Sequence, residues 1–186
     1  MVTDRERIDY LINLYSDKHG VPREYSHAIA HIESRHRHVV DGRIIQSGSG
    51  ALGVFQLMPS TAKGLGVNPK DLEQNIEGGI RYFSQRLELA HGDVPTAIAM
   101  YYAGIGNVRR NNALQWEGVQ TYIRRFNEFI SRNSGKDYIA APIQNVPIQP
   151  TTQNVPVQPT TQEHPVPALF YIVLVMILVI FFFGRN

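Results

Sequence analysis

The sequence predicts an all-α domain of several short helices with a possible small hairpin, then a proline-rich spacer and one C-terminal transmembrane helix. Three observations support this fold class. Apolar residues recur at helical spacing through the first 140 residues, where 17 of the 18 basic and 15 of the 16 acidic residues lie. Proline-rich repeats follow, and after them comes an apolar run without a charge. The strand–helix alternation of a parallel sheet is not found in the sequence.

Two amphipathic helices are predicted in the first 36 residues. Thr3 and Glu6 have the spacing of a capping box, in which each side chain accepts a hydrogen bond from the other residue's backbone amide. Gly20 is expected to end the first helix, and Pro22 to lie in the first turn of the second. The apolar faces contain Ile8, Leu11, Ile12 and Tyr15 in the first helix and Tyr25, Ile29 and Ile32 in the second.

Residues 37–55 are rich in glycine, serine and β-branched pairs, which predicts a long loop or a small hairpin. Four more helices are predicted after it: one from Pro59 to about Gly64, one capped by Asn75 and ended before Gly92, one over 96–103 and one over 118–132. These helices carry enough apolar residues for a modest core, so we expect residues 1–140 to form one domain.

Residues 141–167 form the predicted spacer. They contain most of the prolines, one charged residue (Glu163) and a nine-residue repeat, QNVPIQPTT at 144–152 and QNVPVQPTT at 153–161. Proline removes amide donors and favours polyproline II, so the segment is expected to be extended and semi-rigid. A ligand for a proline-binding domain is the alternative interpretation.

The segment 168–184 is predicted to be a membrane anchor. Its first 16 residues are apolar and uncharged, and the uncharged stretch reaches 19 residues over 166–184, close to the roughly 20 that cross a bilayer core. Tyr171 and Arg185 suit the two interfaces of a membrane. The N-terminal sequence MVTDRERIDY lacks the apolar stretch of a secretory signal.

Composition excludes several classes of protein. The sequence has no cysteine and therefore provides no disulfide, no cysteine-ligated metal centre and no thiol nucleophile. A net charge of +2 is too balanced for electrostatically driven nucleic-acid binding. His27 and His31 share a helical face, but HAIAH lacks the glutamate of a zincin motif. We interpret the histidines as surface or groove-rim residues and predict no metal and no other cofactor.

Glu33 is the residue that most directly indicates a catalytic function. It follows Ile32 near the end of an apolar helix (AIAHIES), where burial would destabilise the carboxylate and raise its pKa toward neutral pH. A carboxyl group of this kind can donate a proton in general acid catalysis. A solvated glutamate at a helix end, or one paired with Arg35 or Arg37, is the alternative.

Two later stretches suit a groove for uncharged polar rings such as sugars. SGSGALGVFQLMPSTA at 47–62 combines glycines, which allow close backbone approach, with Gln56, a polar residue inside an apolar run. In AIAMYYAGIGNV at 97–108, tyrosines precede a glycine-broken loop, and each offers a stacking face and a hydroxyl group.

Glu33-Ser34, GALGVFQLMPSTA, NIEGGIRYF at 75–83 and AIAMYYAGIGNV occur in the order and approximate spacing of a known family. Over about residues 7–132 the chain resembles the soluble lytic transglycosylase (SLT) domain, family 1. The resemblance implies a lysozyme-like fold, similar to goose-type lysozyme, with short helices around a glycan groove. It also implies cleavage of the MurNAc-β-1,4-GlcNAc bond of peptidoglycan with formation of 1,6-anhydro-MurNAc.

Site residues are carried over by position. Glu33 is the expected single catalytic acid/base, and Tyr122 is expected to face it with its hydroxyl group. The expected substrate-binding residues are Ser47, Gln56, Met58, Tyr101 and Tyr122. Two departures from the family pattern stand out. The family triplet A-Y-N reads Met100-Tyr101-Tyr102 here, and residues 38–44 resemble an insertion.

One carboxyl group suffices for the implied reaction because the nucleophile is internal. Glu33 would protonate the leaving oxygen and then accept the proton of the C6 hydroxyl of the same muramic acid, which has a high effective concentration. A hydrolytic glycosidase normally uses two carboxyl groups instead. Asp41 keeps that alternative open, although an Asp-Gly pair is typical of a hairpin turn.

The sequence thus predicts a membrane-anchored lytic transglycosylase. The alternatives are a peptidoglycan-binding structural module with little activity and a hydrolytic muramidase on the same fold. The expected partners are peptidoglycan strands, a lipid bilayer through residues 168–184, and virion or secretion-apparatus proteins, but no nucleic acid. We expect the anchor to lie in the virion membrane of a bacteriophage and to serve local wall opening as the phage enters its host. A bacterial inner membrane, with the domain facing the periplasm, is the alternative location.

Overall fold

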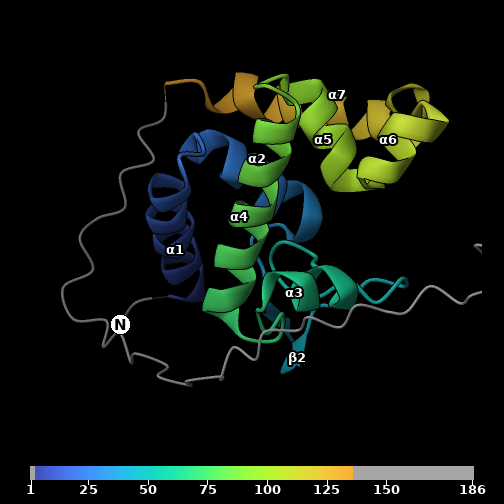
Figure 1. The fold of residues 1–186 in the computed structure, drawn as a ribbon. Coiled ribbons are helices and arrows are strands. Elements are labelled where there is room, and N and C mark those ends of the chain that lie inside the picture. Colours follow the sequence, from blue (N-terminus) through green and yellow to red (C-terminus); the bar gives the residue numbers. More distant parts are fainter. Residues whose placement is uncertain (1–2, 136–186) are drawn as a thin grey trace, which may run out of the picture. The chain divides into compact units, whose positions relative to one another are not determined.

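The computed structural model describes residues 3–135, which form a helical domain with one hairpin (Figure 1). The elements are α1 (Asp4–His19), α2 (Arg23–Ser34), β1 (Val39–Val40), β2 (Arg43–Ile44), α3 (Pro59–Leu65), α4 (Leu72–Leu89), α5 (Val94–Ala103), α6 (Ile105–Asn111), the 3-10 helix η1 (Ala113–Gln115) and α7 (Glu117–Asn133). The predicted helical class with a small hairpin is confirmed for this part of the chain. The predicted boundary at 140, the spacer 141–167 and the anchor 168–184 lie outside the described residues. Within residues 3–135, every helix is too short or too polar to traverse a lipid bilayer.

The first two helices begin and end near the predicted residues. The capping box is present: Thr3 Oγ1 accepts from the Glu6 amide at 3.2 Å, and Glu6 Oε2 accepts from the Thr3 amide at 2.8 Å. Gly20 ends α1 in the left-handed conformation. Pro22 lies one position earlier than predicted, as the N-cap of α2, and this helix ends at Ser34 because Arg35 is left-handed (φ 58°).

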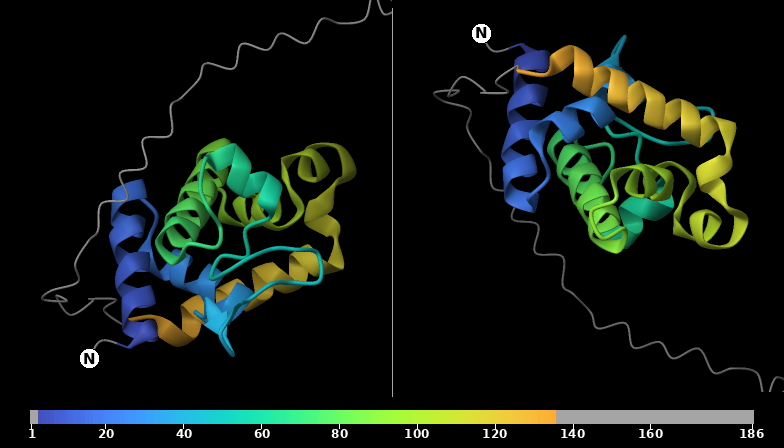
Figure 2. Two further views of the ribbon diagram at one scale, coloured as in Figure 1. Left: turned by 90° about the horizontal axis from the view of Figure 1, so that it is seen from below. Right: turned by 90° about the horizontal axis from the view of Figure 1, so that it is seen from above.

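The core lies around α4, which packs against α1 on one side and α5 on the other, while α2 packs along α7 (Figures 1 and 2). The largest fully buried apolar side chains come from most of these elements and from the loop before α3. They are Ile12, Ile29, Phe55, Ile76, Ile80, Phe83, Ile98 and Phe126. The core therefore joins α2, which carries Glu33, to the helices that carry the predicted tyrosines.

The N-terminus of α4 corrects one prediction. Asp71, not Asn75, is the N-cap, and its Oδ1 accepts from the Gln74 amide at 2.9 Å. Asn75 is fully buried one turn later, where its amide group accepts from the Phe55 amide and donates to the carbonyl groups of Leu52 and Pro69. Its side chain is needed by the neighbouring loop, because that loop's backbone polar groups are buried and require partners.

The segment after α5 corrects a second prediction. Gly104 ends α5 as expected, but α6 begins at the next residue instead of a loop. Gly104 has φ 82° and ψ 151°, so one residue turns the chain and the helix can restart at once. The last helix, predicted over 118–132, extends over Glu117–Asn133.

Candidate functional site

Glu33 lies in the last turn of α2, with its side chain toward α7. The hydroxyl group of Tyr122 donates a hydrogen bond to Glu33 Oε1 at 2.8 Å. Tyr122 is only 5% exposed and comes from the second turn of α7, which packs along α2. The contact expected between the two side chains is therefore present, and it joins residues 89 positions apart in the chain.

Burial raises the pKa of Glu33 from its ordinary 4.5 to about 7. The hydrogen bond from Tyr122 and the positive charge of Arg125 act in the opposite direction, because both stabilise the carboxylate. A carboxyl group with a pKa near 7 can both donate and accept a proton at neutral pH. The arginines named as alternative partners are engaged elsewhere: Arg35 contacts His31, and Arg37 donates to the carbonyl group of Ser34.

Tyr101, on α5, is a second tyrosine that interacts electrostatically with Glu33. Its hydroxyl group donates to the Phe55 carbonyl oxygen at 2.8 Å, which attaches α5 to the loop before α3. Burial, with the negative charge of Glu33 as the next cause, raises the pKa of Tyr101 and of Tyr122 well above the ordinary value. Both phenols are thus neutral hydrogen-bond donors at any physiological pH.

The other three predicted site residues lie on one loop, residues 45–58. Ser47 Oγ accepts from the Ala51 amide at 3.0 Å, and Gln56, which is left-handed (φ 45°), donates to the Gly53 carbonyl oxygen at 2.8 Å. Met58 is exposed just before α3. In the described part of the chain the side chains of Ser47 and Gln56 make their hydrogen bonds within the loop, while Glu33 bonds to Tyr122, so no direct hydrogen bond among these residues joins the loop to Glu33.

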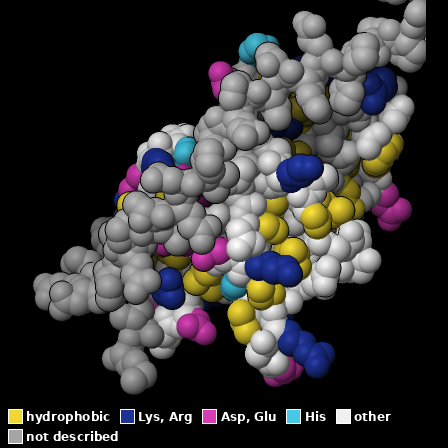
Figure 3. Space-filling view, turned by 60° about the horizontal axis from the view of Figure 1, so that its bottom comes forward, with side chains coloured by type: hydrophobic (Ala, Val, Ile, Leu, Met, Phe, Trp, Pro, Cys, Tyr) yellow, Lys and Arg dark blue, Asp and Glu magenta, His cyan; other side chains and the backbone are white. Residues whose placement is uncertain are grey.

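Tyr102, which stands where the family pattern has asparagine, lies beside the partner of Glu33. The residue is 52% exposed, and its ring centroid is 5.5 Å from that of Tyr122. A pocket of about 370 Å³ opens there, lined by Tyr102, Tyr122, Arg125 and the first turns of α7. Figure 3 shows one face of the molecule on which hydrophobic side chains gather beside Lys and Arg side chains. Tyr102 thus presents an exposed aromatic face next to the Glu33–Tyr122 pair.

Asp41 lies at the tip of the hairpin. Val39 pairs with Ile44 and Val40 with Arg43, which leaves Asp41 and Gly42 as the two turn residues. Both have positive φ, 51° and 72°, as a type I′ turn requires. The expected Asp-Gly hairpin turn is therefore confirmed, and Asp41 is exposed there.

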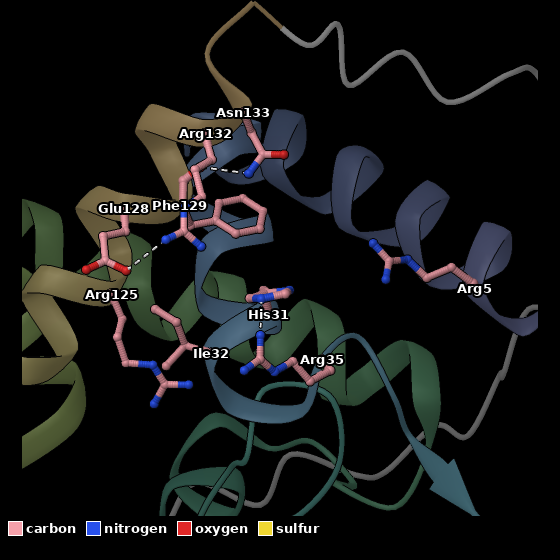
Figure 4. A pocket seen from close by; sticks show the side chains of 9 residues that line it. All are labelled: Arg5, His31, Ile32, Arg35, Arg125, Glu128, Phe129, Arg132 and Asn133. Carbon is pink, nitrogen blue, oxygen red and sulfur yellow. Dashed lines mark hydrogen bonds and ion pairs between the residues drawn. The ribbon is translucent and has the colours of Figure 1, made fainter.

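A second pocket, of about 660 Å³, lies between α1, α2 and α7 (Figure 4). Arg5 borders it from α1 and Arg35 from the end of α2, while Arg125 and Arg132 border it from α7. Glu128 reduces this charge through an ion pair with Arg132. Arg125 lines both pockets, so it links this basic surface to Tyr122.

The interpretation of the histidines as surface or groove-rim residues is wrong for three of them. His27, His36 and His38 are 2%, 3% and 7% exposed. His27 faces α1 and forms a hydrogen bond with Asn13 of that helix. Arg35 and His36 both have left-handed backbone angles, and this turn of the chain places His36 against α1 as well. Helical spacing groups side chains on one face, but it does not say whether that face meets another helix.

Two residues of the site were missed by sequence reasoning. Arg125 acts on the charge of Glu33, and Asn75 holds the loop that carries Gln56. No signal in the sequence marks Arg125 among the neighbouring arginines. The signal for Asn75 is its position in the sequence. It directly precedes the apolar Ile76, and Asp71, four residues earlier, is a better candidate for the N-cap.

The fold and the site together define a helical domain with a part-buried glutamate that accepts a hydrogen bond from a tyrosine hydroxyl group. Comparison with known families identifies it: residues 10–121 match the family described as "Transglycosylase SLT domain". The chain belongs to this family.

Individual relatives agree with this assignment. A transglycosylase of Enterobacteria phage PRD1 is 51% identical over 59 residues, which are 31% of this chain and 22% of that protein. The fold is similar to that of the 70 kDa soluble lytic transglycosylase of Escherichia coli, with a TM-score of 0.57 and 22% identity over 70% of this chain. The lytic transglycosylase Slt of Pseudomonas aeruginosa gives 0.55 and 20% over the same share. The chain spans about a quarter or less of the length of these relatives.

Proposed function

We propose that this chain is a peptidoglycan lytic transglycosylase in which Glu33 acts first as acid and then as base. The observation that carries the proposal is the hydrogen bond between Tyr122 and the part-buried Glu33 in a member of the SLT family. Burial keeps a proton on Glu33 near neutral pH, and Tyr122 fixes the direction of its carboxyl group.

The reaction can be written with one carboxyl group. Tyr122 occupies Oε1, so Oε2 carries the proton to the oxygen that leaves C1 of MurNAc. The C1–O bond breaks with positive charge developing on the ring, and the Glu33 carboxylate then takes the proton of the C6 hydroxyl. The C6 oxygen bonds to C1, which closes the 1,6-anhydro ring, returns Glu33 to its protonated form and consumes no water.

The remaining site residues supply substrate contacts in this proposal. The loop that carries Ser47, Gln56 and Met58 would line the glycan groove, and Tyr101 would hold this loop at a fixed distance from α5. Tyr102 would stack on a sugar ring, since its face is exposed beside Tyr122.

The finer part of the proposal concerns location. We propose that residues 168–184 anchor the enzyme in a phage virion membrane and that it opens the cell wall locally during infection. The apolar sequence of this segment and the relative in Enterobacteria phage PRD1 support this location. Detection of the protein in the membrane of purified virions, and not in envelopes of uninfected cells, would support it. The reverse distribution would favour the bacterial inner membrane.

The activity is tested by digesting purified sacculi with the full chain in mild detergent and weighing the released muropeptides by mass spectrometry. We expect products one water lighter than hydrolytic ones, and none from the Glu33→Gln variant. Products with free reducing ends would identify a muramidase and direct attention to Asp41. Binding to sacculi by a folded protein without any release would identify a structural module.

A further inference from the structure

Three polar side chains outside the proposed catalytic site converge at the junction of α1 and α2. Asp9 comes from α1, His27 from α2 and His36 from the turn that follows α2. His27 Nδ1 lies 3.1 Å from His36 Nε2. Asp9 Oδ1 lies 3.7 Å from the first of these nitrogens and 3.9 Å from the second. Three potential ligand atoms from three segments therefore surround one point.

The spacing of these atoms suits a zinc ion. The circle through three points separated by 3.1, 3.7 and 3.9 Å has a radius of about 2.1 Å. Zinc lies about 2.0–2.1 Å from imidazole nitrogens and about 2.0–2.2 Å from carboxylate oxygens. An ion at the centre of this triangle would lie in the plane of the three atoms, at bonding distance from each of them.

The surroundings orient two of the three ligands, as is usual around protein-bound zinc. Asn13 Oδ1 lies 2.9 Å from His27 Nε2, so that nitrogen carries the proton and Nδ1 turns its lone pair to the cluster. Arg5 Nε donates to Asp9 Oδ2 at 2.7 Å and leaves Oδ1 for the ion. Asp9 Oδ1 is buried and accepts no hydrogen bond from residues 3–135, so this part of the chain leaves it unsatisfied.

The backbone beside His36 agrees with metal binding. Arg35 and His36 are both left-handed, with φ of 58° and 57°. Two successive non-glycine residues in this region cost free energy, and such strain persists where the surrounding structure requires it.

We propose that Asp9, His27 and His36 bind one zinc ion that fastens the start of the chain to the end of the Glu33 helix. A water molecule would be the fourth ligand, and small side-chain shifts would bring the ion out of the plane of the three protein atoms into the tetrahedral arrangement that zinc prefers. A pocket of about 460 Å³ lies beside the cluster and is lined by Arg5 and His36. His36 lies three residues beyond Glu33 in the chain, and the role of the zinc site is to position α2. The inference stands without the proposed activity, since it rests on a different set of residues.

The competing account is a hydrogen-bonded pair of neutral imidazoles without a metal. His36 Nε2–H would then donate to His27 Nδ1 over the observed 3.1 Å. This account leaves Asp9 Oδ1 without a partner and predicts no response to zinc.

The test is zinc binding by the full chain. Protein purified in mild detergent and freed of metal with a chelator is titrated with zinc chloride by calorimetry, and its thermal unfolding is followed with and without zinc. We expect one zinc ion per chain and a rise of the unfolding midpoint of at least about 5 °C at saturating zinc. Cobalt(II) in place of zinc should give the intense visible absorption of a four-coordinate site.

Two matched histidine variants separate the site from incidental binding. His36→Asn removes one ligand and should weaken zinc binding at least about 100-fold, whereas His91→Asn should bind as the unaltered protein does. Both positions have positive φ, which asparagine tolerates, and His91 is exposed far along the chain. Asp9→Asn provides a second loss of a ligand at a part-exposed position if His36→Asn does not fold. The proposal is overturned if the unaltered chain binds no stoichiometric zinc, or if its affinity survives the loss of His36 or Asp9.

Discussion

Replacing Glu33 by glutamine should make the protein more stable at alkaline pH while it removes activity. The folded state raises the pKa of Glu33 from 4.5 to about 7, so it holds the proton more tightly than the unfolded chain does. The tighter proton binding adds to the free energy of unfolding. This addition is complete below about pH 4.5 and is lost as the pH rises to about 7. A shift of about 2.5 units at 1.36 kcal/mol each corresponds to about 3 kcal/mol. Glutamine does not titrate and escapes this loss.

The assay is urea unfolding of the full chain at pH 4.5 and pH 8, followed by far-UV circular dichroism. We expect Glu33→Gln to gain up to about 3 kcal/mol over the unaltered protein at pH 8 and little at pH 4.5. Glu88→Gln, an exposed change near the end of α4, serves as the control for the loss of a negative charge. A stability difference between Glu33→Gln and the unaltered protein that is the same at both pH values would refute the reasoning.

Three further changes test the contacts around the site. Tyr122→Phe removes a bond that stabilises the Glu33 carboxylate, so the pKa of Glu33 should rise and the alkaline limb of the pH–activity profile should move up by about one unit; an unmoved limb would contradict this. Asn75→Ala leaves three backbone groups, two of them buried, without their partner and should lower the free energy of unfolding by about 3 kcal/mol in a urea titration. Gly79→Ala places a methyl group about 2.3 Å from the Phe55 side chain and should cost about 1–3 kcal/mol in the same titration, whereas exposed Gly64→Ala should not destabilise.

Local signals in the sequence predicted most of the helices. The capping box of Thr3 and Glu6 and the glycine at position 20 act within one or two turns, so they can be interpreted without knowledge of the rest of the fold. The family resemblance also led to the contact between Tyr122 and Glu33, which no local pattern could indicate across 89 residues.

Features that depend on packing could not be predicted in this way. Asn75 and Asp71 are both good caps, and only the approach of the loop before α3 decides that Asn75 is buried instead. The restart of a helix after Gly104 depends on one residue's backbone angles. The burial of His27 and His36 follows from the way α2 meets α1, which helical spacing does not determine.

The position of Glu33 in the last turn of α2 has an electrostatic consequence. The carbonyl groups at the end of a helix carry a partial negative charge of roughly half an electron, which disfavours a nearby carboxylate and favours a nearby cation. A sugar ring that loses its leaving group becomes such a cation for a moment. The helix end would therefore oppose the loss of the proton from Glu33 before the bond breaks and attract the ring once it has broken, so the backbone itself would act in both halves of the proposed reaction.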